Sequence, residues 1–221
     1  MISGVNFLGK TLLAITLASA IGSLSASAQT LQLAKFSAGE LQGWKEKSFV
    51  GHTEYKLVTL DGKQVLRANT QGTASILYIE KKIDLTKTPW INWSWKISNI
   101  YSGLNEQTKK GDDYPARIYA IVKTGFFPWQ TRALNYVWSS TTPENKSWKN
   151  AYTSNARMIA VRSGTKSAGQ WQQEKRDLRE DYYQQFGERI DQIDGIAIMA
   201  DSDDSGLQAT SYFGDIYFTD Q

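Results

Sequence analysis

Alternation of apolar and polar residues is the dominant pattern of the chain beyond residue 29. Residues 92–97 alternate strictly, which places Trp93 and Trp95 on one face of a predicted strand. Residues 117–123 alternate in the same way. This period of two is typical of strands with one buried face, so we interpret Trp93 and Trp95 as core residues. Similar patterns predict further strands at residues 31–36, 74–83, 133–139, 193–200 and 208–218.

Two hairpins are predicted from local turn signals. Residues 54–60 and 63–69 flank Asp61-Gly62, a dipeptide that favours the type I′ turn of a tight hairpin. Residues 158–162 and 169–175 surround a Gly-Thr-Lys-Ser segment. We therefore expect these two segments to pair with each other as neighbouring strands.

Helical periodicity is confined to one short segment. Leu178, Tyr182 and Phe186 recur every four residues, and Gly187 stands where a helix cap is expected. Roughly ten strands with turns between them and one short helix are typical of a β-sandwich. The predicted fold is therefore all-β, a two-sheet antiparallel jelly-roll β-sandwich with one short helix.

The first 28 residues have the pattern of a targeting segment. Lys10 is their only charged residue, the apolar run 12–21 follows it, and Ala26-Ser27-Ala28 forms an A-x-A cleavage site. The run is shorter than the roughly 20 apolar residues that a spanning helix needs. We expect residues 1–28 to be a cleaved signal peptide and residues 29–221 a single periplasmic or secreted domain, an uncleaved anchor being the alternative. No later run is long enough to span a membrane.

Composition and charge exclude some classes of partner. The chain has no cysteine, so an exported domain of this sequence depends on its hydrophobic core rather than on disulfides. Without Lys10, 25 − 1 = 24 basic residues face 22 acidic residues, a balance that argues against nucleic-acid binding. The chain contains 8 Trp and 11 Tyr, side chains that serve both cores and ligand-stacking surfaces.

The densest cluster of charge before a strand is residues 111–119, with the sequence GDDYPARIY. Turns of this kind are frequent places for functional residues on β-scaffolds. Asp113 and Arg117 have the same parity, so in an extended segment they could pair across Pro115. Either the pair contributes to a ligand site, or it fixes the loop to the strand.

The acidic loop 201–206 suggests calcium, because clustered carboxylates suit a hard cation. The sequence does not match the EF-hand template. We expect a calcium site, if present, to use Asp201, Asp203 and Asp215, and no other cofactor is indicated. The alternative is a polar turn in which the aspartates bond to their own backbone.

Several aromatic and charged residues are candidates for ligand binding. Sugars present C–H faces that stack on indole rings, while their hydroxyl groups bond to charged and amide side chains. Trp148 and Trp171 lie beside polar segments and are the best stacking candidates. The expected ligand-binding residues are Asp113, Arg117, Tyr119, Trp148, Trp171, Glu174 and Asp201.

Several of these motifs together resemble a bacterial exported family known as domain of unknown function 3047. The stretch 111–119 is similar to its central motif, and the supporting segments follow in the expected order. These are WSWK at 93–96, Trp171 with Glu174 and Arg176, DY at 181–182 with FG at 186–187, MADSD at 199–203 and YFGDI at 212–216. The resemblance implies a galactose-binding-like jelly roll, similar in outline to carbohydrate-binding modules, and implies no particular activity.

Three functional hypotheses follow. The first is an exported, non-catalytic module that binds a glycan or another polar envelope polymer. The second is a glycosidase or other polysaccharide-degrading enzyme, which needs two carboxylates across a groove; Asp113, Glu174 and Asp201 are the candidates. The third is an envelope protein–protein interaction domain. Catalysis by other familiar routes lacks support, because His52 is the only histidine and no cysteine nucleophile is present.

Overall fold

The computed structural model describes residue 1, residues 29–125, residue 127 and residues 130–221. The expected signal peptide, apart from its first residue, therefore lies outside the described residues. Within the described ranges, no helix combines the length and apolar character needed to cross a membrane.

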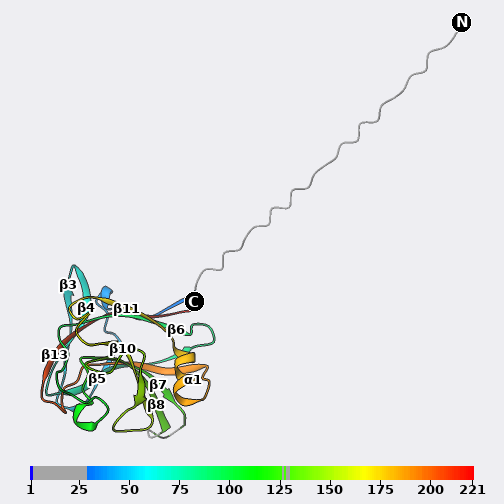
Figure 1. Cartoon of the computed structure of the whole chain (residues 1–221). Coiled ribbons are helices and arrows are strands. Elements are labelled where there is room, and N and C mark those ends of the chain that lie inside the picture. The colour runs from blue at the N-terminus through cyan, green and yellow to red at the C-terminus, as the bar shows by residue number, and fades with distance from the viewer. Residues whose placement is uncertain (2–28, 126, 128–129) are drawn as a thin grey trace.

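Two β-sheets pack face to face (Figure 1). Sheet A has the strand order β11-β6-β13-β4-β3, with β1 also paired to β13. Sheet B has the order β2-β5-β12-β7-β8-β10-β9. The bounds in sheet A are β1 Thr30–Ala34, β3 Glu54–Leu60, β4 Lys63–Gln71, β6 Trp90–Ile97, β11 Gln172–Asp177 and β13 Gln208–Thr219. Those in sheet B are β2 Lys45–Val50, β5 Ala74–Asp84, β7 Ala116–Lys123, β8 Thr131–Ser139, β9 Ser147–Lys149, β10 Ala156–Ser163 and β12 Gln192–Met199. The predicted all-β sandwich is confirmed.

The strands β8 and β10 form a parallel pair, whereas the other ladders are antiparallel. The predicted pairing of 158–162 with 169–175 is wrong, because β10 belongs to sheet B and β11 to sheet A. The connection between them crosses from one sheet to the other. At its start Gly164 N–H donates to the carbonyl of Ser139 on β8, and near its end Gly169 N–H donates to Ile97 on β6. The segment 164–171 is therefore a connection between the two sheets and not the turn of a hairpin.

The other local predictions agree with the structure. Asp61 and Gly62 have φ of 52° and 76°, the two positive values that a type I′ turn requires. The helix α1, Leu178–Phe186, begins where Asp177 accepts a hydrogen bond from Glu180 N–H and ends at Gly187, with φ of 73°. The described residues also include the short 3₁₀ turns η1 Phe36–Ala38 and η2 Lys109–Gly111.

The main hydrophobic core fills the space between the sheets and contains a cluster of large aromatic rings. Trp93 contacts Trp95 edge-on, with ring centroids 5.4 Å apart, and stacks on Tyr136 of β8 at 5.2 Å. Trp138 packs against Trp95 at 5.9 Å. Trp93 and Trp95 are only 2% and 0% exposed, so they are core residues as predicted. Burying a large apolar side chain contributes about 1.5–3 kcal/mol, which makes this cluster a main source of stability.

The two ends of the described domain lie side by side. Thr30 of β1 pairs with Thr219 of β13 in an antiparallel ladder. Gln29 N–H donates to the Asp220 carboxylate at 2.9 Å, and the Asp220 N–H donates to the Gln29 carbonyl. The first and last strands of the described domain are thus neighbours in sheet A.

Candidate functional site

The stretch 111–119 forms a tightly packed corner where a long loop enters β7. Gly111 is required there, because a Cβ atom at this position would lie 2.4 Å from the carbonyl oxygen of Asn105. The same loop is bonded to the next long loop through Glu106, which is 1% exposed. Its carboxylate accepts hydrogen bonds from the hydroxyl group of Thr142 at 2.9 Å and from Ser139. The close contact at Gly111 and the hydrogen bonds of Glu106 therefore both fix the position of this corner.

Arg117 is the centre of this corner and is only 3% exposed. Its Nε donates to Oδ1 of Asp201 at 2.8 Å, and its Nη2 donates to the other carboxylate oxygen and to the carbonyl of Asp112. The guanidinium also stacks on the ring of Tyr114, 4.3 Å from the centroid. Such a two-point ion pair connects the start of β7 to the loop after β12.

The predicted ion pair between Asp113 and Arg117 is wrong. The carboxylate of Asp113 instead accepts from the backbone N–H groups of Asp204 and Ser205, at 3.3 and 2.7 Å. Arg117 pairs with Asp201, which follows β12, the neighbour of β7 in sheet B, and lies far away in the sequence. Parity along one segment could not reveal a partner from another strand.

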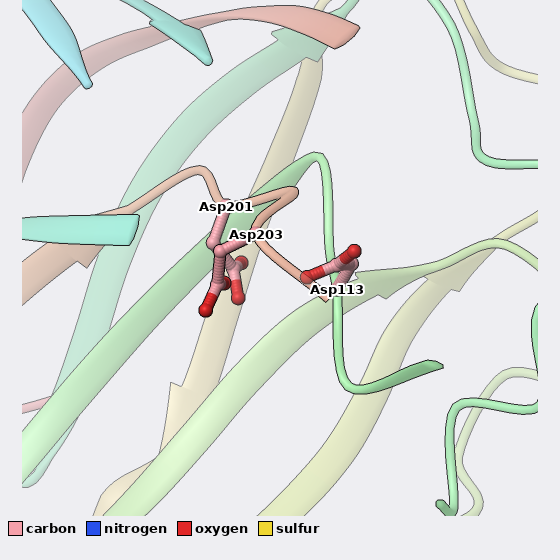
Figure 2. A group of neighbouring side chains, drawn as sticks. All are labelled: Asp113, Asp201 and Asp203. Carbon is pink, nitrogen blue, oxygen red and sulfur yellow. The ribbon is translucent and has the colours of Figure 1, made fainter. Parts of the chain in front are cut away.

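Asp201 of this ion pair belongs to a group of three neighbouring carboxylates, which Figure 2 shows. Asp113, Asp201 and Asp203 each place an oxygen atom within 4.8 Å of the others, so these residues could hold a cation. Asp215, the third expected calcium ligand, is not among them, because it accepts hydrogen bonds from the backbone and hydroxyl groups of Ser37. The calcium hypothesis stays a prediction, with Asp113 in the place of Asp215.

Burial shapes the electrostatics of this acidic cluster. Burial raises the pKa of Asp201 well above its usual value, although the charge of Arg117 opposes the shift. Burial also raises the pKa of Asp203, and the neighbouring carboxylates of Asp204 and Asp113 add to the effect. The pKa of Asp112 is raised by burial too and is partly lowered again by Arg117. Carboxylates outnumber guanidinium groups here, so negative charge is crowded.

Tyr119 and Trp148, two expected ligand-binding residues, pack around the same corner. The Tyr119 hydroxyl accepts from Arg117 at 3.3 Å and contacts the sulfur of Met199 at 3.0 Å. Trp148 covers a small apolar cluster of Tyr114, Val137 and Met158, away from the main core. Both aromatic side chains therefore pack against residues of the corner.

A separate groove lies on the outer face of sheet A, with a volume of about 1050 Å³. Alternation along the strands places its polar residues opposite the core. Its lining includes Asn92, Ser94, Trp171, Gln173, Asp215 and Tyr217. Of the expected ligand-binding residues, Trp171 and Glu174 border this groove, whereas Asp113, Arg117, Tyr119, Trp148 and Asp201 belong to the corner. The structure thus divides the expected site into two.

Glu174 has a structural partner set. Its carboxylate accepts from Trp95 Nε1 at 3.0 Å and from both sides of the Arg162 guanidinium, at 2.6 and 3.2 Å. Because Arg162 lies on β10 and Glu174 on β11, this ion pair ties sheet B to sheet A. The three candidate catalytic carboxylates are not assembled: Asp113 and Asp201 are buried together, and Glu174 is at the groove.

A bulge in β13 places Tyr217, the second large aromatic side chain of the groove besides Trp171, on the outer face of sheet A. The pairing between β13 and β6 shifts by one residue between Phe213 and Ile216. Tyr212 and Tyr217 are five positions apart, and this extra residue lets both face outward. At the bulge, a Cβ atom on Gly214 would lie 2.2 Å from the Ser94 hydroxyl, so a larger residue would require this hydroxyl to rotate.

Sequence reasoning missed most of the groove. Asn92 and Ser94 alternate with the two core tryptophans, which was a sufficient signal that they face the opposite side of β6. Tyr217 had no such signal, because the bulge reverses the facing of residues beyond it. Gln173 lies beside Ser94 because β11 pairs with β6. The expected hairpin of 158–162 with 169–175 assigned β11 a different neighbour.

Comparison with known proteins adds the family. Residues 42–217 match the model of a family described as "Protein of unknown function (DUF3047)". The chain belongs to this family. The predicted resemblance is confirmed, and the matched range contains both the corner and the groove. Among proteins with curated descriptions, none matches the DUF3047 chain.

Solved structures of similar fold include carbohydrate-binding modules. The family 30 module of a cellulosomal cellulase of Clostridium thermocellum is 16% identical, with a TM-score of 0.52 over 87% of this chain and 98% of that one. A mutant family 29 carbohydrate-binding module is 9% identical, with a TM-score of 0.42 over 88% and 93%. The K1 cleaved adhesin domain of Lys-gingipain from Porphyromonas gingivalis is 11% identical, with a TM-score of 0.43 over 87% and 98%. The first of these supports the sandwich fold.

Proposed function

We propose that this DUF3047 protein is an exported, non-catalytic module that binds a glycan in the groove of sheet A. The groove itself is the observation that carries the proposal. Its volume of about 1050 Å³ is at the upper end of ordinary ligand sites, and it is open to solvent along a sheet face. An open groove of this kind suits a chain molecule better than a small compact ligand.

The lining has the chemistry that sugars need. Trp171 and Tyr217 are half-buried aromatic residues, whose accessible faces can stack on the C–H side of a pyranose ring. Between them, the exposed Gln173 supplies an amide group for hydroxyls, and Asn92, which is 7% exposed, lies at the base of the groove. Asn92 is held in place by its donation to the Trp90 carbonyl at 3.1 Å, which leaves its oxygen to accept.

Two further observations support binding without catalysis. The family 30 carbohydrate-binding module shares the fold, and that protein is named as a binding module. The buried carboxylates Asp113 and Asp201 are occupied by backbone amides and by Arg117, so neither faces a substrate groove. Glu174 is bound to Arg162 and Trp95. A glycosidase would need two carboxylates free on either side of a bond.

The test is glycan binding with a groove variant and a matched control. We expect the protein to bind one class of polysaccharide on a glycan array, and Trp171→Ala to weaken this binding by about tenfold or more, since stacking of a ring contributes about 1–2 kcal/mol. Tyr183→Ala removes another exposed aromatic residue, on α1 and outside the groove, and should leave binding unchanged.

Other outcomes would favour the remaining hypotheses. Release of reducing ends from a bound polysaccharide would contradict the non-catalytic assignment. Absence of binding to every glycan, with a folded protein, would contradict the proposal and favour an envelope protein partner. Export is tested separately, by locating the protein in cell fractions and determining the N-terminus of its mature form.

A further inference from the structure

The outer face of sheet A carries an excess of basic side chains. Register places Lys96 of β6, Tyr212 of β13, Arg67 of β4 and Lys56 of β3 in one row across four strands. A second row joins Lys175, Asn92 and Tyr217. Basic residues on this face are Lys56, Lys63, Arg67, Lys96 and Lys175, and acidic residues are Glu54, Asp61, Asp177 and Asp215. Glu174 also lines the groove and is paired with Arg162.

The acidic residues of this face already have partners. Glu54 pairs with Arg67 at 2.8 Å, and Asp61 pairs with Lys96 at 3.6 Å. Asp215 accepts the backbone and hydroxyl groups of Ser37. The charges of Glu54 and Asp61 are therefore offset by basic side chains. Asp215 and Asp177 are bonded to neutral groups, which do not offset a carboxylate charge.

Two lysines of the groove are left without an acidic partner. Within the part of the chain that the structure describes, Lys63 and Lys175 form no ion pair, and both are exposed. The ammonium group of Lys175 lies over the ring of Trp90, 4.9 Å from its centroid, which holds it at the groove edge. Lys63 and Lys175 thus offer unpaired positive charge to a ligand in the groove. Among the described lining residues, Asp215 is the one carboxylate without a basic partner.

The two lysines stand on opposite sides of the groove. Lys175 lies on β11 and Lys63 on β4, three strand positions apart in the sheet. At about 4.8 Å per strand this separation is about 14 Å, which is longer than one sugar ring. The aromatic residue Tyr217 lies on β13 between them. Charged groups and stacking groups therefore alternate across the sheet.

We propose that the polymer bound in this groove is an acidic polysaccharide, whose carboxylate groups pair with Lys63 and Lys175 while its rings stack on Trp171 and Tyr217. This inference rests on the proposed glycan-binding function and specifies its ligand class. Neutral glycans would use the aromatic and amide side chains without these ion pairs, and so would bind more weakly.

The experiment compares charged and neutral forms of one polymer. Binding of the protein to polygalacturonate, alginate and hyaluronate is measured by calorimetry at low salt, each against its methyl-esterified form. We expect at least one acidic polymer to bind about tenfold more tightly than its ester, because two exposed ion pairs each give about threefold. Raising the salt concentration should remove this difference by screening.

Variants then assign the effect to the groove. The double variant Lys63→Gln/Lys175→Gln should bind the acidic polymer and its ester equally, while Trp171→Ala should weaken binding of both. Lys149→Gln removes an exposed lysine of β9, at the edge of sheet B, and should change nothing. Equal loss in Lys149→Gln would indicate general attraction of a polyanion and would overturn the inference.

Failure of this inference is distinguishable from failure of the proposed function. If the protein bound the acidic polymers and their esters equally well, and Trp171→Ala weakened both, the acidic ligand class would be overturned. Glycan binding in the groove would then still hold. No binding to any polymer would overturn both.

Discussion

Arg117 and Asp201 form a buried ion pair that joins two strands of sheet B at their ends. The Nε of Arg117 lies 2.8 Å from Oδ1 of Asp201, and the two residues are 3% and 2% exposed. Tyr114 adds its backbone N–H to the same carboxylate, at 3.2 Å. The charged motif 111–119 thus holds the fold together, while the open groove lies on the other sheet.

Removing the guanidinium should strongly destabilise the protein. We expect Arg117→Ala to lower the free energy of unfolding by about 3–5 kcal/mol, because it leaves the buried Asp201 without its partner. Arg117→Lys should recover only part of this, since an ammonium group cannot bond to both carboxylate oxygens in the same geometry. Denaturant unfolding measures both.

A surface ion pair provides the control for this prediction. Arg132→Ala removes a pair with Glu188, whose side chain is 60% exposed, and should cost about 1 kcal/mol or less. Comparable losses in the Arg117 and Arg132 variants would contradict a structural role for the buried pair.

The close approach at Gly111 predicts a second effect on stability. Gly111→Ala would place a methyl group 2.4 Å from the backbone of Asn105 and should cost about 1–3 kcal/mol, because backbone must move. Gly103→Asn in the same loop is the matched control. Gly103 has φ of 78° with open space around it, and asparagine tolerates this conformation. If both variants melt like the original protein, the loop is looser than the structure indicates.

The acidic cluster predicts an unusual dependence of stability on pH. The pKa values of Asp112 and Asp203 are raised by burial above the unfolded value of about 3.9. The folded state therefore binds more protons than the unfolded state just above pH 4, and stability falls as the pH rises through this window. In the presence of a chelator, we expect a higher melting midpoint at pH 5 than at pH 7.5.

Other carboxylates set the lower limit of this effect. A hydrogen bond from Lys123 lowers the pKa of Glu80, and one from Arg132 lowers that of Glu188. Their stabilising contribution is lost as the pH falls through their folded values, so the midpoint should decline below about pH 4. Asp203→Asn should reduce the gain between pH 7.5 and pH 5. If the melting midpoint of this variant still rose by the same amount from pH 7.5 to pH 5, a group other than Asp203 would cause the pH dependence.

Calcium binding is a separate prediction of the same cluster. If Asp113, Asp201 and Asp203 hold a cation, millimolar calcium should raise the melting midpoint at pH 7.5, because a ligand of the folded state stabilises it. A chelator should reverse the shift and Asp203→Asn should abolish it, whereas Asp215→Asn should retain it. An unchanged midpoint would mean that Arg117 and the backbone amides suffice to hold the carboxylates.

Local signals of the sequence were enough for most elements. The Asp61-Gly62 turn was predicted because positive φ is a property of single residues, and it holds in the structure. The core role of Trp93 and Trp95 followed from alternation within one strand. Each of these inferences depends on residues that are neighbours in the chain.

Relationships between distant strands were beyond such signals. Arg117 was predicted to pair with Asp113, four residues away, and pairs with Asp201 across the β7–β12 ladder. Tyr217 reaches the groove because β13 contains a bulge, which shifts facing by one residue. Adjacent aromatic residues on both sides of the bulge, at 212–213 and 217–218, conceal from simple alternation which of them faces inward. The expected site residues were divided between corner and groove because strand order, not sequence order, determines which side chains meet.

The pairing of β1 with β13 has a consequence for the connectivity of the domain. Because Gln29 and Asp220 are hydrogen-bonded to each other, a short flexible linker could join the two ends without disturbing either sheet. New ends could then be opened at the exposed turn between Asp61 and Gly62. A circular permutant of this kind should keep the same core, since the order in which the strands are synthesised is not part of what holds them together.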